Sequence, residues 1–354
     1  MKKNKNLGLW LSLLVILIIF TLPISSIAKF VLIVLLLGSF LFWKRSIFWY
    51  MQANKHVVKP DSNEWEKAWP LYQKAIRNGL PSGFVITAAS MYLQRGDYSV
   101  GKKLIEDYLQ KSEKNKDVNL VNISKTMVSM SYWMDGDLDK AIQTVKEVYD
   151  SGYRDKNLFI NYGTYALEKG DLETARKLIK EGKELEKSSP GIFDNRGWLM
   201  ILEGKWEEAQ GLYHELVGKS PRFPEPFVHA AQVKVHYGRV GEALELLERA
   251  TNARFSNTSG MKRDTLLQLK EYLENPETRR AAALAIDKNP KMVASGKFPP
   301  KTQQSFEREE GDFLSGFAKE IEKPILVEDE EGERLPNTEL TDDDIEYAKK
   351  HNLE

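Results

Sequence analysis

Two histidines, His229 and His236, form the pair of side chains whose spacing best suits chemistry. They are seven residues apart, so in a helix they would share one face, and imidazole is a common zinc ligand. A metal site needs at least a third ligand, and the nearest acidic residues, Glu225 and Glu242, fall at ordinary surface positions of the predicted helices. The chain has no cysteine, which excludes thiolate ligands, a cysteine nucleophile and disulfides. We therefore predict no metal site.

Other catalytic patterns are missing from the sequence. It has no glycine-rich phosphate loop, no serine with a plausible base nearby and no motif in a catalytic order. The carboxylates fall mostly on Glu/Lys helix faces, where pairing across one turn explains them. Residues 61–275 carry 31 basic and 32 acidic side chains, whereas phosphate recognition needs a concentrated basic face. We predict no catalytic residue, no cofactor, no enzymatic activity and no nucleic-acid partner.

The residues that must be positioned lie in an internally repeated region. Turn glycines recur at intervals of 40, 34, 34 and 34 residues, at Gly96, Gly136, Gly170, Gly204 and Gly238. Five residues after each glycine stands a small residue: Gly101, Ala141, Ala175, Ala209 and Ala243. Another stands seven residues before each: Ala89, Ser129, Gly163, Gly197 and Ala231. Small residues let two antiparallel helices approach closely, and the glycine between them reverses the chain.

This pattern resembles the tetratricopeptide-repeat (TPR) family over about three-fifths of the chain. The 34-residue period, the small residues and turns such as Gly96-Asp97-Tyr98 match the family, and Pro221 matches its closing proline. The resemblance implies an all-α fold, a right-handed superhelical solenoid of TPR-like helix pairs. We expect it over 61–275, with a half-repeat at 61–78, five pairs over about 81–253 and a cap helix at 261–274. Stacked pairs bury a continuous core that a single pair cannot.

In that family the first helix of each pair lines a concave groove that usually holds a peptide. The partner-binding candidates carried over to this groove are Met130, Trp133, Met134, Asn161, Asn195, Trp198 and Gln232. Asn161 and Asn195 fall in the same slot of adjacent repeats, where an amide can hold an extended backbone. The slots lack the cations with which some TPR domains clamp a carboxylate. In the alternative interpretation, the Trp and Met side chains are core and the Asn side chains are solvated.

The N-terminal region predicts a membrane anchor. Residues 7–51 are long enough for a two-helix transmembrane hairpin, about 7–24 and 27–49, with its turn near Pro23. Residues 1–60 contain eight Lys or Arg and no acidic residue, and most of these cations flank the two helices. The positive-inside rule then places both ends, and the repeats, on the cytoplasmic side. A cleaved secretory signal ending near Ala28 is the alternative.

The last segment, 276–354, predicts a linker and a mostly disordered acidic tail. Residues 301–354 carry 7 basic and 17 acidic side chains, a net charge of −10. Such a stretch buries too little apolar surface to offset its ordering entropy. It is either a solvating tail or a docking motif, including an internal ligand for the groove.

Together these features predict a multi-pass membrane scaffold or adaptor. The bilayer would hold residues 7–51, and the cytoplasmic solenoid would bind a protein or peptide in its groove. The alternative is a regulatory subunit of a membrane transport or cell-envelope enzyme complex that contacts its partner through the hairpin. An extracytoplasmic repeat domain would require the opposite topology.

Overall fold

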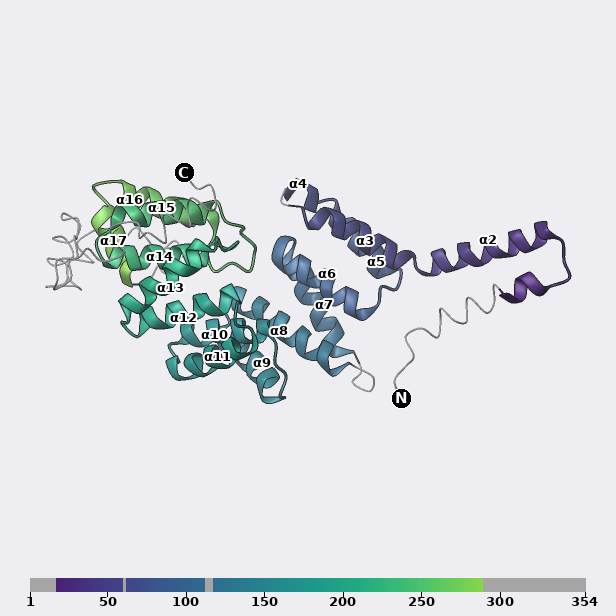
Figure 1. Ribbon diagram of the computed structural model, residues 1–354, viewed down its shortest axis with the longest axis horizontal. Coiled ribbons are helices and arrows are strands. Elements are labelled where there is room, and N and C mark those ends of the chain that lie inside the picture. Colours follow the sequence, from purple (N-terminus) through teal and green to yellow (C-terminus); the bar gives the residue numbers. More distant parts are fainter. Residues whose placement is uncertain (1–16, 60–61, 112–116, 289–354) are drawn as a thin grey trace, which may run out of the picture. The chain divides into compact units, whose positions relative to one another are not determined.

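The computed structural model describes residues 17–59, 62–111 and 117–288 (Figure 1). Every regular element in these residues is a helix, which confirms the predicted all-α fold for this part of the chain. The chain divides into two compact units. One ends at Ser131 and the other begins at Tyr132, so the boundary falls inside a single helix.

The first unit contains one exposed helix and two packed pairs. Its helices are α2 (Ser26–Trp43), α3 (Arg45–Val57), α4 (Ser62–Trp65), α5 (Ala68–Arg77), α6 (Ser82–Arg95), α7 (Tyr98–Gln110) and the start of α8 (Val118–Met134). Helix α3 packs against α5, and α6 against α7. The core of this unit includes Tyr50, Val57 and Tyr72, each buried.

The apolar N-terminal region ends earlier than the sequence predicts. The second membrane helix was expected over 27–49, but α2 ends at Trp43 and Lys44 interrupts the helix. The next residues start α3, which buries one face at Ser46, Tyr50, Ala53 and Val57. These positions recur every three or four residues, as one face of a helix does. Residues 45–51 therefore belong to a helix that packs, through Ser46 and Tyr50, within the first unit.

This packing also corrects the predicted half-repeat at 61–78. Helix α5 is not an unpaired second helix, because α3 precedes it and packs along it. Of the first predicted membrane helix, 7–24, only residues 17–24 lie in the described part, and 17–21 of these are helical. The ammonium of Lys29 in α2 donates to the carbonyl of Phe20 at 2.7 Å, which holds the start of α2 beside that short helical turn.

The second unit is a series of antiparallel pairs. After the end of α8 follow α9 (Leu138–Asp150), α10 (Lys156–Lys169), α11 (Leu172–Leu185), α12 (Pro190–Leu202), α13 (Trp206–Gly218), α14 (Glu225–His236) and α15 (Val240–Thr251). Within this series α10 packs against α11, α12 against α13, and α14 against α15. Each first helix also contacts the next first helix, α10 with α12 and α12 with α14.

The turn glycines do two different things. Gly136, Gly170, Gly204 and Gly238 adopt positive φ angles between 71° and 84°, a conformation that side-chain-bearing residues rarely take. Gly96 is extended instead, and a Cβ there would lie 2.9 Å from the Trp69 ring. The small residues five positions after these glycines lie in the second helices and are fully buried: Ala141, Ala175, Ala209 and Ala243. A Cβ on Gly101 would lie 2.7 Å from the Ala89 carbonyl oxygen.

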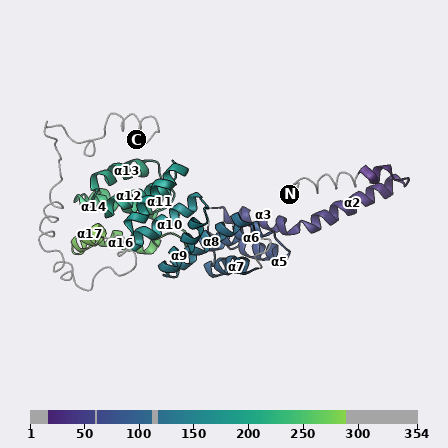
Figure 2. The ribbon, with the colours of Figure 1, turned by 90° about the horizontal axis from the view of Figure 1, so that it is seen from below.

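The described part of this unit ends with two more helices, α16 (Arg263–Glu274) and α17 (Arg279–Lys288). Helix α16 corresponds to the cap helix predicted at 261–274, but α17 lies in the segment predicted as a linker. It packs against both α14 and α16, and Figures 1 and 2 show it beside them. Six consecutive residues, Ala281 to Ile286, are buried. The acidic tail predicted beyond it lies outside the described residues.

Candidate functional site

Asn195, a predicted groove residue of α12, contacts α10. The Asn195 amide nitrogen donates to the Ile160 carbonyl at 2.9 Å, and its oxygen accepts from the Thr164 hydroxyl at 3.0 Å. Asn195 is buried, and Gly163 leaves the space it occupies, since a Cβ there would lie 2.9 Å from the Asn195 nitrogen. Its hydrogen bonds are thus used between neighbouring helices, whereas the sequence predicts a groove position.

Trp198 and Gln232 are also inside the second unit. The Trp198 ring stacks on His229 of α14, with 5.3 Å between ring centroids and 20° between planes. The Gln232 side-chain amide donates to the Asp287 carbonyl of α17 at 2.8 Å. Trp198 is 9% exposed and Gln232 3% exposed, so neither offers much surface to a partner. Helix α17 covers the part of α14 that the sequence assigned to the groove.

The remaining candidates are half-buried. Met130 belongs to the first unit, and Trp133, Met134 and Asn161 belong to the second. The Trp133 indole nitrogen donates to a carboxylate oxygen of Glu168 at 2.7 Å, and its ring lies 6.1 Å from that of Tyr165. Trp133 therefore has a packing role on α10.

One spacing links these contacts. Trp133 bonds Glu168, Asn195 bonds Ile160, and His229 contacts Asp194, each across 35 residues. This spacing is one repeat plus one residue, so each first helix is tied to the next. The Asn195 and His229 contacts fall at the same positions of successive repeats, whereas Trp133 and Glu168 meet nearer the turn glycine. The sequence interpretation took the slots as sites for a partner and missed the bonds among them. The 35-residue separation of polar and aromatic residues was the signal that could have shown them.

The two histidines each pair with a different aspartate. Nδ1 of His229 lies 2.9 Å from Asp194, which also accepts at its backbone carbonyl from the Tyr213 hydroxyl at 3.0 Å. Nδ1 of His236 lies 2.8 Å from the carboxylate of Asp287, and its ring stacks on Trp206 with centroids 3.7 Å apart. Among the described residues, no cluster of three or more His, Cys, Asp or Glu is placed to hold a metal ion.

The Asp194–His229–Tyr213 cluster is enclosed. Burial raises the pKa of Tyr213 well above its ordinary value, and the nearby Asp194 raises it further. Nε2 of His229 and the side-chain oxygen of Gln232 are buried and make no hydrogen bond with the described residues. The contacts of Asp194 with Tyr213 and His229 connect α12, α13 and α14. The cluster is closed to a substrate, because His229 is only 2% exposed.

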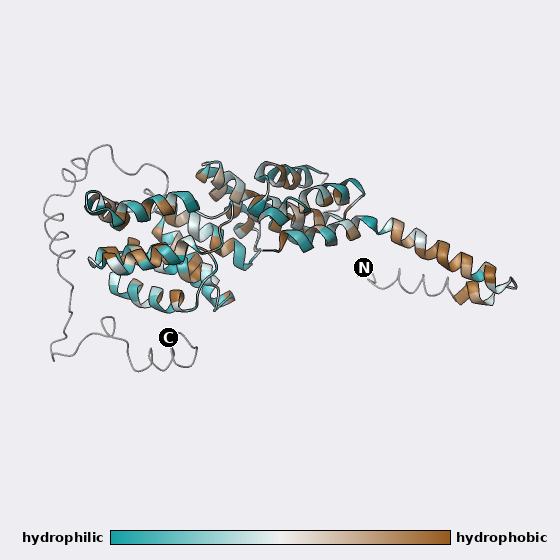
Figure 3. Ribbon diagram, turned by 90° about the horizontal axis from the view of Figure 1, so that it is seen from above, coloured by the Kyte–Doolittle hydropathy of each residue, from teal (hydrophilic) through white to brown (hydrophobic). Residues whose placement is uncertain are grey.

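Helix α2 is the other candidate functional element. None of its 18 residues is buried, and its length and composition would allow it to cross a membrane. Figure 3 shows it as an almost wholly hydrophobic helix, in contrast to the mixed surfaces of the repeats. It is the one such helix among the residues that the structure describes, and it lies near the N-terminus.

The fold and these contacts define a protein of tandem antiparallel helix pairs. No family model matches the chain. It is 26% identical over 160 residues to the TPR repeat-containing protein YpiA of Bacillus subtilis, a match that spans 45% of this chain and 37% of the relative. It is 24% identical over 170 residues to U-box domain-containing protein 70 of rice, spanning 46% of this chain and 20% of the relative.

Among solved structures, a tetratricopeptide repeat protein from Parabacteroides merdae is similar at 13% identity, with a TM-score of 0.45. That match covers 80% of this chain and 99% of the other. The chain spans about a third and a fifth of the length of the two curated relatives it matches.

Proposed function

We propose that this chain is a membrane-anchored scaffold whose TPR-like repeats bind another protein or a peptide. The observation that carries the proposal is the direct connection of an exposed apolar helix to a repeat helix. In α2, Ile27 is 78% exposed and Trp43 is 71% exposed. Only Lys44 separates α2 from α3, the first helix that packs with the repeats.

The residues at the end of α2 support an interface with lipid headgroups. The Lys44 ammonium lies 4.4 Å from the centre of the Trp43 ring, and the Arg45 guanidinium lies 3.7 Å from that of Phe42. Aromatic rings and cations together are typical of the ends of membrane helices. The cationic end would then face the cytoplasm, with the repeats on the same side.

Membrane extraction tests the anchor. We expect the full chain to float with vesicles and to resist alkaline carbonate. A Leu35→Asp, Leu37→Asp variant should be released, since each acidic residue at a helix centre costs about 2.5–3.5 kcal/mol of insertion. The matched control is Leu185→Asp, Leu202→Asp, which makes the same change at exposed leucines of the repeats. Equal retention of both variants would contradict the anchor.

The absence of cysteine makes a topology test simple. A Glu173→Cys variant places one thiol at an exposed position of α11. In sealed cells, a membrane-impermeant maleimide should label it only after lysis if the repeats are cytoplasmic. Labelling of intact cells would reverse the proposed topology.

Met134 is one of the four half-buried groove candidates, with Met130, Trp133 and Asn161. A photo-reactive amino acid in place of Met134 should cross-link to a partner in native membranes, and the same group in place of Glu173 should not. Cross-links that arise only from positions in α2 would instead favour the regulatory-subunit alternative, in which the membrane segment makes the contact.

A further inference from the structure

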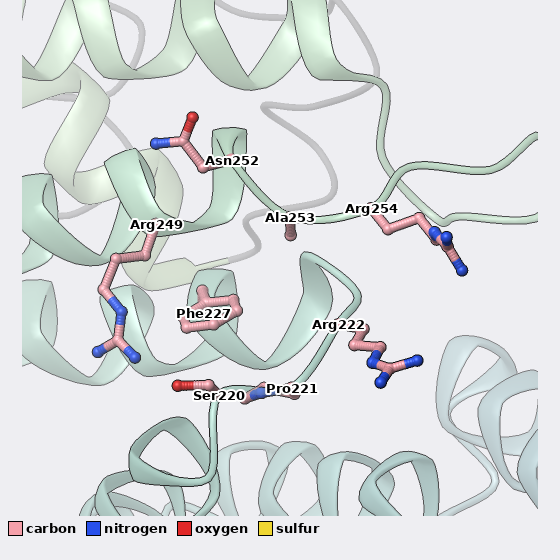
Figure 4. Close-up of a pocket in the computed structure, with 8 residues that line it drawn as sticks. All are labelled: Ser220, Pro221, Arg222, Phe227, Arg249, Asn252, Ala253 and Arg254. Atoms are coloured by element: carbon pink, nitrogen blue, oxygen red, sulfur yellow. The ribbon is translucent and has the colours of Figure 1, made fainter. Parts of the chain in front are cut away.

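An open pocket of about 470 Å³ lies where the α13–α14 loop meets the end of α15 (Figure 4). Three arginines, Arg222, Arg249 and Arg254, belong to its lining, with Phe227 between them. None of the residues that line it is acidic. The pocket lies wholly within the second unit and away from the groove candidates, and the proposed function does not use it.

The local sequence fixes the shape of this pocket. Ser220 has a positive φ of 49° just after α13, and the buried Pro221 follows. The Arg254 backbone N–H donates to the Arg222 carbonyl at 2.8 Å, which joins the loop after α13 to the loop after α15. The two arginine side chains therefore start from a pair of connected backbone segments.

Arg249 is held in place from inside the unit. Its guanidinium donates to the Val217 carbonyl at 2.9 Å and lies 4.9 Å from the centre of the Phe227 ring. Desolvation lowers the pKa of Arg249 from its ordinary value. The Arg249 guanidinium is thus partly desolvated, and its hydrogen bond to a neutral carbonyl leaves its charge unpaired.

The three guanidinium groups have no carboxylate partner within the described ranges. Some other cations of this unit are paired, as Arg176 is with Glu203 and Lys234 with Glu242. The acid nearest in sequence to the pocket, Glu248, is already 2.9 Å from Lys270. The lining of the pocket therefore combines three arginines with no acidic side chain.

The arrangement of the cations selects the chemistry of the ligand. In Figure 4, Arg249 lies on one side of Phe227, whereas Arg222 and Arg254 lie on the other and extend the same way. An extended segment with several carboxylates suits cations on both sides of the ring, because each guanidinium can bind one carboxylate through two hydrogen bonds.

We propose that this pocket binds the acidic C-terminal segment of the same chain, centred on residues 328–333. That stretch reads Glu-Asp-Glu-Glu-Gly-Glu, five carboxylates in six positions, and residues 301–354 have a net charge of −10. The 39 residues between Lys288 and Glu328 span more than about 100 Å when extended, at ~3.3 Å or more per residue. Tethering gives the segment an effective concentration of the order of millimolar, so a modest affinity suffices.

Cross-linking in the full chain tests this contact. Asn252→Cys places a thiol at the pocket and Glu331→Cys places one in the acidic segment; the chain has no other cysteine. A short bis-maleimide should join them within one molecule at low salt. Adding Arg222→Glu and Arg254→Glu should slow the reaction at least about tenfold. So should 1 M salt, at which the screening length is about 3 Å.

Two controls make the result specific. Lys156→Glu with Lys180→Glu makes the same charge change at exposed residues of the same unit and should leave the rate unchanged. Reversing the charge of the acidic segment, with Glu328→Arg and Glu330→Arg, should slow cross-linking to the wild-type pocket. The same segment should cross-link rapidly again when the pocket carries Arg222→Glu and Arg254→Glu. A rate that ignores the pocket reversal and salt would overturn the proposal. Cross-links mainly between two molecules would also overturn it, since a second copy would then be the occupant.

Discussion

At the scale of single residues, close approach between helices explains why Gly197 stands inside a helix, where turn geometry plays no part. Gly197 in α12 faces Tyr213 in α13, and a Cβ on it would lie 2.5 Å from that ring. Tyr213 is 1% exposed and bonded to Asp194, so it has no space into which to move. The glycine therefore sets the distance between α12 and α13.

We expect Gly197→Ala to destabilise this pair by about 1–3 kcal/mol, the usual cost of overpacking a core. Hydrogen exchange of the α12 and α13 amides would measure the loss. Gly211→Ala is the matched control: Gly211 lies within α13, and a Cβ there would meet nothing within 4 Å. That change should be neutral or stabilise by up to about 1 kcal/mol. A loss for Gly211→Ala as large as that for Gly197→Ala would show that contact with Tyr213 does not decide the cost.

Asp171 illustrates how the turn sequence also caps a helix. Its carboxylate accepts from the Thr174 backbone N–H at 3.1 Å, and the hydrogen bonds with Thr174 lower its pKa. A depressed pKa in the folded state means that the stabilisation is present above the unfolded-state pKa. It is lost as the pH falls through the lower, folded-state pKa.

Asp171→Ala should therefore cost about 1 kcal/mol at neutral pH. The difference from wild type should shrink as the pH falls below the ordinary aspartate value, and thermal unfolding at several pH values would show it. Lys205 occupies the equivalent slot of the next repeat and makes no capping bond. Lys205→Ala should cost less than about 0.5 kcal/mol, because it removes only an exposed ion pair with Glu203. A pH-independent effect of Asp171→Ala would rule out the ionised cap.

At the scale of elements, the repeat could be predicted from the sequence, because its glycines and small residues act locally. The surface of the first helices could not. Eight of the 13 residues of α12 and nine of the 12 of α14 are buried, against four of the 12 of α15. A helix enclosed by neighbours on several sides has no separate polar face for periodicity to reveal. Asn195, Trp198 and Gln232 were consequently predicted at a groove and lie inside.

Two helix assignments depended on tertiary packing. Lys44 and Arg45 follow Trp43, but apolar residues resume at Ile47, so the sequence was interpreted as one membrane helix running to residue 49. The packing of Tyr50 and Val57 against α5 shows that α3 is a separate helix. Helix α17 has only ten residues, and a helix of that length is marginal in water on its own. Burial against α14 and α16 stabilises α17, and these contacts cannot be predicted from the sequence of α17 alone.

We expect α17 to be part of the folded unit. A chain that ends after Lys288 should protect the α14 amides from hydrogen exchange as well as the full chain does. A chain that ends after Asn275 should lose that protection. Ile286→Ala should cost about 2–5 kcal/mol, as for other fully buried isoleucines. Unchanged exchange after removal of α17 would mean that it covers α14 without stabilising it.

At the scale of the whole molecule, stability should be distributed along the chain. The core of the first unit, around Tyr72, consists of residues from α3, α5 and α6 with Leu80, whereas α12 to α17 share another core in the second unit. In stacked repeats each pair contacts mainly its neighbours, so stability is approximately a sum of local terms. Damage to one core should then remain local.

We therefore expect Tyr72→Ala, which removes a fully buried aromatic ring at a cost of about 3–5 kcal/mol, to accelerate hydrogen exchange in α3, α5 and α6 only. Exchange in α13, α14 and α15 should stay within error of wild type. Ile286→Ala should give the opposite pattern and serves as the reciprocal control. If either substitution accelerated exchange in both units, the chain would unfold as one cooperative body. The boundary inside α8 would then divide the chain into two groups of contacts that nevertheless unfold together.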